Sequence, residues 1–212
     1  MRERAYTGGA VAHIKGMEPI LTRRRALLLA PAGVLAVGLA GAGAYLSMRP
    51  EEAAPAIGGP FALLDGDGRA VTEAQFRGRW MMVYFGYTHC PDACPTALQD
   101  MANALDALGA KKKEVAAVFI TIDPERDTPA VMKDYVAAFD STIVPLSGSV
   151  EAVARVAREY RVYFAKHPTS DGGYDMDHSS IIYVMDRAGR FVTNFTHETP
   201  PEQMAAKLRT LV

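Results

Sequence analysis

The sequence predicts an α/β domain in which parallel and antiparallel strands share one sheet, preceded by a single membrane-spanning helix. Three observations support this. Apolar runs of strand length alternate with segments whose apolar residues recur at helical spacing, the last two runs flank a short turn, and about 21 residues near the N-terminus carry no charge. With 212 residues and 49% hydrophobic composition, the chain suits one compact domain plus an appendage.

Composition excludes some classes of protein. The net charge is −1, with 23 Lys and Arg against 24 Asp and Glu, and the basic residues form no stripe of the kind that binds nucleic acid. The chain has only two cysteines, four positions apart, so no disulfide framework holds the fold together. The pair is therefore judged as a local chemical site.

The uncharged segment, residues 26–46, is long enough to cross the ~30 Å core of a bilayer. Three arginines, residues 23–25, precede it directly, which predicts a cytoplasmic segment at 1–25 and a single-pass anchor in the bacterial inner membrane, with the C-terminal domain in the periplasm. The alternative is a cleaved signal peptide, since small residues follow the apolar run. Residues 47–59 are rich in Pro and Gly and predict a linker, so the domain is expected at 60–212.

The domain is expected to open with a hairpin. Short apolar runs at 61–64 and 69–71 flank Asp65-Gly66-Asp67-Gly68, and Asp-Gly supplies turn geometry between strands. A helical turn follows at 72–77. The continuous apolar run 80–85 has the length of a buried central strand.

A strand, helix, strand unit comes next. Apolar residues recur at helical spacing from Ala97 to Leu108, Gly109 ends that helix, and residues 115–122 form a second apolar strand. The crossover should be right-handed. The later elements are a helix from the Thr128 cap and Pro129 to Phe139, a strand at 143–146, a helix capped by Ser149, a strand-like run at 162–164, a polar loop at 167–177, strands at 181–185 and 191–195, and a helix opened by Pro200 or Pro201.

The cysteines lie where the central strand ends and the following helix begins, the usual position of sites in open α/β sheets. With Asp92 as the expected N-cap, Cys90 lies in the loop and Cys94 in the first helical turn, near the positive helix end that stabilises thiolates. Three residues separate the two, rather than the two of a thioredoxin-type redox pair, which favours a metal ion bound by both sulfurs. Two thiolates and one imidazole suit Cu(I), Cu(II) or Zn(II). A dithiol redox role, with Cys90 and Cys94 as the catalytic pair, and merely buried small residues are the alternatives.

Five histidines can complete such a site. His13 precedes the membrane segment, His89 adjoins Cys90 but should point away from it, and His167 and His197 are expected in solvated loops. His178 lies on a loop entering the strand at 181–185. The segment from Asp123 to Pro129 leaves a neighbouring strand at the same edge of the sheet. Its simplest interpretation is a capped turn, and the functional alternative is that Asp123 accepts a hydrogen bond from a ligand imidazole and orients it.

Five motifs together resemble the SCO/SenC family of copper-binding proteins needed to assemble cytochrome c oxidase. The resemblance covers the chain from Gly59 onward. The motifs are Gly59-Pro60-Phe61, Trp80-Met-Met-Val-Tyr-Phe-Gly-Tyr-Thr88, Cys90-Pro-Asp-Ala-Cys94-Pro-Thr96, Asp123-Pro-Glu-Arg-Asp-Thr-Pro129 and Asp177-His178-Ser-Ser-Ile-Ile-Tyr183. The resemblance implies a thioredoxin-like fold, one membrane helix, and copper ligation by Cys90, Cys94 and His178.

The resemblance also implies a function, in two forms. The first is a metallochaperone, a binding protein without turnover, that takes copper from a periplasmic donor and delivers it to the binuclear copper centre of oxidase subunit II. The second is a thiol-disulfide oxidoreductase that reduces the subunit II cysteines before metallation. Because a disulfide between Cys90 and Cys94 cannot bind copper, a thiol reductase partner is implied as well. Peroxide reduction by Cys90 is a weaker third hypothesis.

Overall fold

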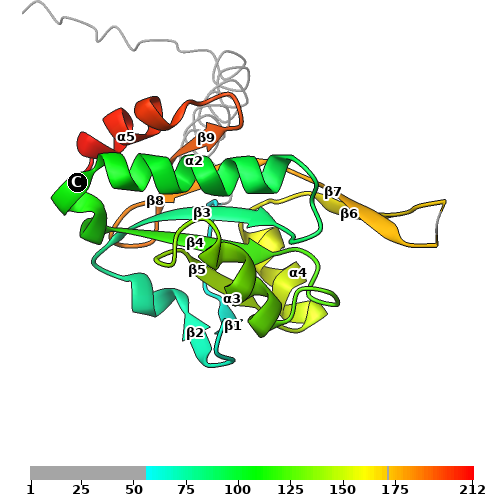
Figure 1. The fold of residues 1–212 in the computed structure, drawn as a ribbon. Coiled ribbons are helices and arrows are strands. Elements are labelled where there is room, and N and C mark those ends of the chain that lie inside the picture. Colours follow the sequence, from blue (N-terminus) through cyan, green and yellow to red (C-terminus); the bar gives the residue numbers. More distant parts are fainter. Residues whose placement is uncertain (1–55, 171) are drawn as a thin grey trace, which may run out of the picture. The chain divides into compact units, whose positions relative to one another are not determined.

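The computed structural model describes residues 56–170 and 172–212, which form an α/β domain around one mixed sheet (Figure 1). In chain order the strands and helices are β1 (Ala62–Asp65), β2 (Ala70–Thr72), the 3-10 helix η1 (Glu73–Phe76), β3 (Trp80–Gly86), α2 (Ala93–Ala107), the 3-10 helix η2 (Gly109–Glu114), β4 (Val115–Thr121), α3 (Pro129–Ala137), β5 (Val144–Ser147), α4 (Val150–Glu159), β6 (Phe164–Pro168), β7 (Tyr174–His178), β8 (Ile181–Met185), β9 (Phe191–Thr196) and α5 (Pro201–Arg209).

The main sheet has the strand order β2-β1-β5-β4-β3-β8-β9. β3, β4 and β5 are parallel neighbours. β8 pairs antiparallel with both β3 and β9, and β1 pairs antiparallel with β5. The expected mixed sheet is therefore confirmed. β3 and β4 are almost wholly buried, as their continuous apolar runs predict for strands covered on both faces.

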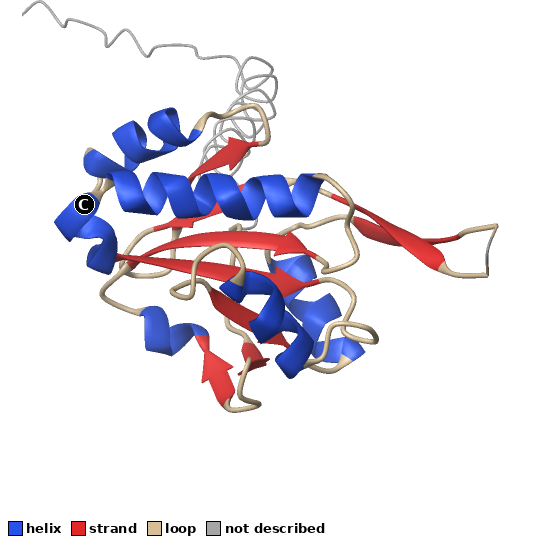
Figure 2. Cartoon of the chain, in the orientation of Figure 1, coloured by secondary structure: helices blue, strands red, loops and turns tan. Residues whose placement is uncertain are grey.

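Helices cover both faces of this sheet (Figure 2). Successive residues of a strand point to opposite faces, so Tyr84 and Phe85 mark the two sides. Tyr84 stacks on Phe119, which contacts Tyr135 of α3, and the Tyr84 hydroxyl lies 3.8 Å from Cys94 Sγ of α2. Phe85 instead packs on Tyr160, directly after α4. α2 and α3 therefore share one face, with α5 beside α2, and α4 covers the other.

Most expected elements lie within one or two residues of their predicted bounds. α3 and α4 have the N-caps that the sequence predicts. The hydroxyls of Thr128 and Ser149 accept hydrogen bonds from the backbone N–H groups of Val131 and Ala152, respectively. Asp92 precedes α2 but makes no capping hydrogen bond with its side chain.

One expectation is wrong. Residues 167–177 are not a polar loop, because β6 and β7 pair along five residues each to form a separate two-stranded sheet. This hairpin extends from the domain (Figure 1) and ends at His178. Polar contacts support the pairing, since the Lys166 ammonium lies 3.7 Å from the Tyr174 ring centroid and His167 Nε2 lies 2.8 Å from the Asp177 carboxylate. The Met176 side chain of β7 is buried in the core of the domain.

The predicted membrane segment and the cytoplasmic segment before it lie outside the described residues. In the parts of the chain that the structure describes, no helix is long and apolar enough to cross a membrane. Residues 56–59, assigned to the linker from sequence, contact the domain, since the Gly58 N–H donates to the Glu159 carbonyl over 2.8 Å.

Candidate metal centre

The structure brings Cys90, Cys94 and His178 together. One ligand atom from each lies within 4.8 Å of the other two, although His178 is 84 positions from Cys94 in the chain. The cysteines come from the loop after β3 and the first turn of α2, whereas the histidine is the last residue of β7. The site therefore joins the start of α2 to the end of the β6–β7 hairpin.

The imidazole is oriented for coordination. His178 Nε2 lies 3.5 Å from Cys94 Sγ, and its Nδ1 lies 3.3 Å from the carbonyl oxygen of Ser179. Donation from Nδ1 to that carbonyl leaves the Nε2 lone pair free to bind a metal. A single ion can reach both atoms, because typical bond lengths of about 2.0 Å to nitrogen and about 2.3 Å to sulfur together exceed their separation.

Aromatic rings surround the histidine and fix its position. The rings of Tyr84 and Tyr87 meet the His178 ring edge-on, at centroid distances of 6.2 and 5.9 Å. The Tyr87 hydroxyl also accepts a hydrogen bond from the Met176 N–H at 3.5 Å, which ties β7 to the loop after β3. Neither tyrosine was singled out from the sequence. The period-two alternation of β3 could have indicated Tyr84, which lies two residues before Gly86 on the face that α2 covers.

The two sulfurs differ in environment. Cys94 is fully buried and Cys90 is half-buried, and neither forms a disulfide. The Cys94 N–H lies 3.4 Å from Cys90 Sγ. In the metal-free pair, the hydrogen bond from the Cys94 side chain lowers the pKa of Cys90 to about 3, with help from His178 and backbone N–H groups. The same hydrogen bond, together with burial, raises the pKa of Cys94. The pair thus holds one thiolate, at Cys90, and one thiol.

Burial raises the pKa of Tyr84, so its hydroxyl stays protonated and donates toward Cys94 Sγ. Gly86, the last residue of β3, lets these groups approach. A Cβ atom at this position would lie 2.5 Å from Cys94 Sγ, far inside normal contact. The end of β3 therefore requires a residue without a side chain.

A buried carboxylate anchors the loop after β3, which carries Cys90. Asp127 is fully buried and accepts hydrogen bonds from the Thr88 N–H at 3.1 Å, the Thr88 hydroxyl at 2.6 Å and the Thr121 hydroxyl at 2.7 Å. His89 lies on the same loop with its side chain 54% exposed, and its Nδ1 is 3.1 Å from the Thr88 hydroxyl. His89 is not in the ligand group that the described residues form. Sequence reasoning placed weight on Asp123 and passed over Asp127 in the same motif.

Asp123 has partners other than the histidine. Its carboxylate accepts a hydrogen bond from the Tyr174 hydroxyl at 2.8 Å and pairs with Arg126. The Arg126 guanidinium lies 3.8 Å from the Tyr174 ring centroid and donates to the Tyr174 carbonyl at 3.0 Å. Asp123 thus anchors the β6–β7 hairpin, which carries His178, whereas Ser179 is the partner of the imidazole.

Comparison with known proteins places these features in a family. The SCO1/SenC family model matches residues 49–212. The SCO1 homolog 1 of Arabidopsis thaliana mitochondria is 44% identical over 144 residues, 68% of this chain but only 43% of that protein. The mitochondrial SCO2 homolog of Bos taurus is 39% identical over 189 residues, 82% of this chain and 71% of that protein.

A solved structure of Bradyrhizobium japonicum ScoI with copper bound is 50% identical to this chain, with a TM-score of 0.70. It aligns over 74% of this chain and 100% of that structure. The mixed sheet with its covering helices and the Cys-Cys-His group fit the thioredoxin-like fold and the metal that the sequence motifs imply. The chain therefore belongs to the SCO1/SenC family.

Proposed function

We propose that this protein is a copper metallochaperone that delivers one ion to the binuclear copper centre of cytochrome c oxidase subunit II. The observation that carries the proposal is the convergence of Cys90, Cys94 and His178, with ligand atoms within 4.8 Å of one another. Two thiolates and an imidazole bind copper more tightly than most divalent ions. The copper-bound ScoI structure, half identical in sequence, supports copper as the cargo.

The geometry suits an ion that must be both held and released. Cys94 is fully buried, whereas Cys90 and His178 are half-buried. Three ligands leave the ion open to a further donor, so an acceptor thiolate or imidazole can bind before Cys90 leaves. Transfer then proceeds without a free ion in solution.

Location and partners belong to the same proposal. Residues 26–46 anchor the chain in the bacterial inner membrane, with the copper domain in the periplasm, where a copper donor loads it. Because the periplasm is oxidising, Cys90 and Cys94 can form a disulfide, and a thiol reductase must then restore them.

A second function is favoured by one observation, the opposite shifts in the pKa values of Cys90 and Cys94. The Cys90 thiolate can attack one sulfur of a subunit II disulfide, which releases the other sulfur as a thiolate and leaves a mixed disulfide with Cys90. The Cys94 thiol, on losing its proton, can then attack Cys90 Sγ and release the first sulfur of the subunit. The two electrons come from the dithiol, which ends as the Cys90–Cys94 disulfide. This reductase would act on the same partner as the chaperone.

One experiment separates the two functions. The reduced full chain in mild detergent is compared with His178→Ala, and with His197→Ala as a control, since His197 is exposed and outside the ligand group. We expect about one copper per chain in wild type and in the control, and its loss or a changed absorption spectrum in His178→Ala. The variant should keep the ability to reduce a disulfide in subunit II. Failure of the fully reduced wild type to bind copper would overturn the chaperone and leave the reductase.

A further inference from the structure

The end of the sheet opposite the metal centre carries a concentration of basic side chains. β3 and β4 begin side by side, with Trp80 paired to Val115, and the β8–β9 turn lies beside them because Met81 pairs with Met185. The chain before each strand and the turn all contribute cations to this end. We call them the basic end: Arg77, Arg79, Lys111, Lys112, Lys113, Arg187 and Arg190.

Part of this charge is not neutralised within the domain. Lys112 pairs with Asp106 and Asp140, Arg187 with Glu114, and Arg190 with Asp186, and the Lys111 ammonium donates to the terminal residue Val212. Arg77, Arg79 and Lys113 are exposed, and within residues 56–170 and 172–212 no carboxylate forms an ion pair with them. Around the metal centre, toward the other end, Arg126 and Lys166 pair with Asp123 and Glu125, and Asp177 faces His167. Asp92 and Asp175 are exposed there, and no ion pair of the described residues includes them. The domain is therefore charged unequally along β3.

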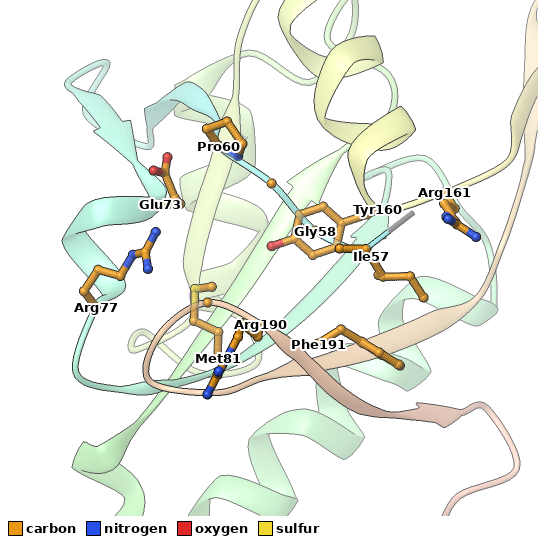
Figure 3. A pocket seen from close by; sticks show the side chains of 13 residues that line it. Ile57, Gly58, Pro60, Glu73, Arg77, Met81, Tyr160, Arg161, Arg190 and Phe191 are labelled. Carbon is orange, nitrogen blue, oxygen red and sulfur yellow. The ribbon is translucent and has the colours of Figure 1, made fainter. Parts of the chain in front are cut away.

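The chain enters the domain at the basic end. Ala56, Ile57 and Gly58 line a pocket of about 740 Å³ together with Arg77 and Arg190. Figure 3 shows the side chains of Arg77 and Arg190 at the edge of this pocket, with Ile57 and Gly58 along its wall. Nine residues, 47–55, separate this point from the end of the proposed membrane span. Nine residues reach at most about 30 Å, so the basic end cannot lie far from the bilayer surface.

We propose that the basic end docks on the anionic headgroups of the membrane that anchors the chain, which turns the metal centre toward the periplasm. The interaction is electrostatic, with phospholipid phosphates facing Arg77, Arg79 and Lys113. Seven residues of β3 separate the two ends, so the docked domain holds the copper site roughly 20 Å further from the bilayer than its basic end. The acidic side chains around the site are repelled by the same surface. This inference rests on the proposed anchor but not on copper binding.

The only tryptophan of the chain is a built-in probe for this docking. Trp80 lies at the basic end, where it lines a surface pocket with Arg187 and Arg190. The full chain is reconstituted into phosphatidylcholine vesicles with or without phosphatidylglycerol, each carrying a headgroup-attached spin-label quencher. We expect Trp80 fluorescence to be quenched strongly only in the anionic vesicles. The quenching should be lost in 1 M salt, where the Debye length falls to about 3 Å.

Matched variants test the surface. Arg77→Gln/Lys113→Gln removes two charges from the basic end, and Lys133→Gln/Arg155→Gln removes two exposed charges from α3 and α4. Each basic residue near an anionic membrane changes the ratio of docked to undocked domain roughly fivefold, so the first variant should lower it roughly 25-fold and the control should quench like wild type. Equal quenching in neutral and anionic vesicles, or equal quenching of both variants, would overturn the proposal.

The anchor is measured in the same samples by flotation in high salt, which removes electrostatic binding. A chain that does not float contradicts the anchor, and docking is then judged from quenching when anionic vesicles are added at low salt. Copper stoichiometry, measured separately, shows whether the metal centre is intact in each variant, so failure of docking is distinguishable from failure of the copper function.

Discussion

Gly86→Ala should damage both the fold and the metal centre through a single steric contact. The added Cβ would lie 2.5 Å from Cys94 Sγ, 3.0 Å from the Phe119 ring and 3.1 Å from the Tyr84 ring. All three neighbours are fully buried, so none can move into solvent. Overpacking of this kind costs about 1–3 kcal/mol of the free energy of unfolding. For a protein of this size, that lowers Tm by about 2–12 °C.

Cys94 Sγ is the atom nearest to the added Cβ, so the substitution should move this sulfur away from His178. If the same free energy is lost from the metal complex, copper affinity falls roughly 5- to 150-fold. Thermal unfolding of the reduced, metal-free chain and a copper titration measure the two effects. Gly148→Ala is the control, because its added Cβ would meet the flexible Leu63 side chain at 3.1 Å.

A double-mutant cycle identifies the cause. In a Cys94→Ala background the shortest contact is gone, so Gly86→Ala should lower Tm by clearly less than in wild type. An equal fall in both backgrounds would refute the assignment to sulfur. An unchanged Tm and copper affinity in the single variant would refute the steric argument altogether.

Three other predictions concern the groups around the sulfurs. Tyr84→Phe keeps the ring but removes the hydroxyl near Cys94, so the absorption bands and reduction potential of bound copper should shift while stoichiometry stays at one; an unchanged potential would contradict a role for this hydrogen bond. Asp127→Asn leaves a buried amide facing the Thr88 N–H, and thermal unfolding should show a loss of about 1–3 kcal/mol, whereas a loss near zero would mean that the loop is held otherwise. Alkylation of Cys90 in the metal-free chain, followed by mass spectrometry, should slow little between pH 8 and pH 5, because its pKa is lowered to about 3; an ordinary thiol slows roughly a thousandfold. Since the folded-state pKa lies below the unfolded one, this thiolate stabilises the fold above pH ~8.5, and that contribution is lost as pH falls toward about 3.

The sequence predicts the core of the fold well because the core obeys simple periodicities. The apolar runs of β3 and β4 leave little alternative to buried parallel strands, and the hydroxyls of Thr128 and Ser149 cap the helices that their positions indicate. The spacing of Cys90 and Cys94 indicates a site at the end of β3. What spacing cannot provide is the distance to His178, which comes from the motif resemblance.

The β6–β7 hairpin was not predicted from the sequence, and the reason is physical. β7 alternates, with Tyr174, Met176 and His178 on one face and Asp175 and Asp177 on the other, but only Met176 of these is buried and β6 is mostly exposed, so the pattern is too short and too polar to predict a strand pair. The pairing is stabilised by contacts between side chains remote in sequence, such as Arg126 with Tyr174, 48 positions apart. The role of Asp127 was missed for a similar reason, because its hydrogen-bond partner Thr88 is 39 positions away in the chain. Single-sequence reasoning identifies candidate polar residues there but not their partners.

Because the cysteines lie in the loop after β3 and in α2, whereas His178 ends β7, the bound ion is also a cross-link. Joining Cys94 to His178 closes a loop of 84 residues, comparable to a disulfide that removes about 4.6 kcal/mol of chain entropy from the unfolded state. Without the ion, the hairpin is held to the domain by the buried Met176 side chain, by the hydrogen bond from the Met176 N–H to the Tyr87 hydroxyl, and by the contacts of Tyr174 with Asp123 and Arg126. Loss of the ion therefore removes one cross-link between the hairpin and the domain, and the free energy of unfolding should fall while these other contacts remain.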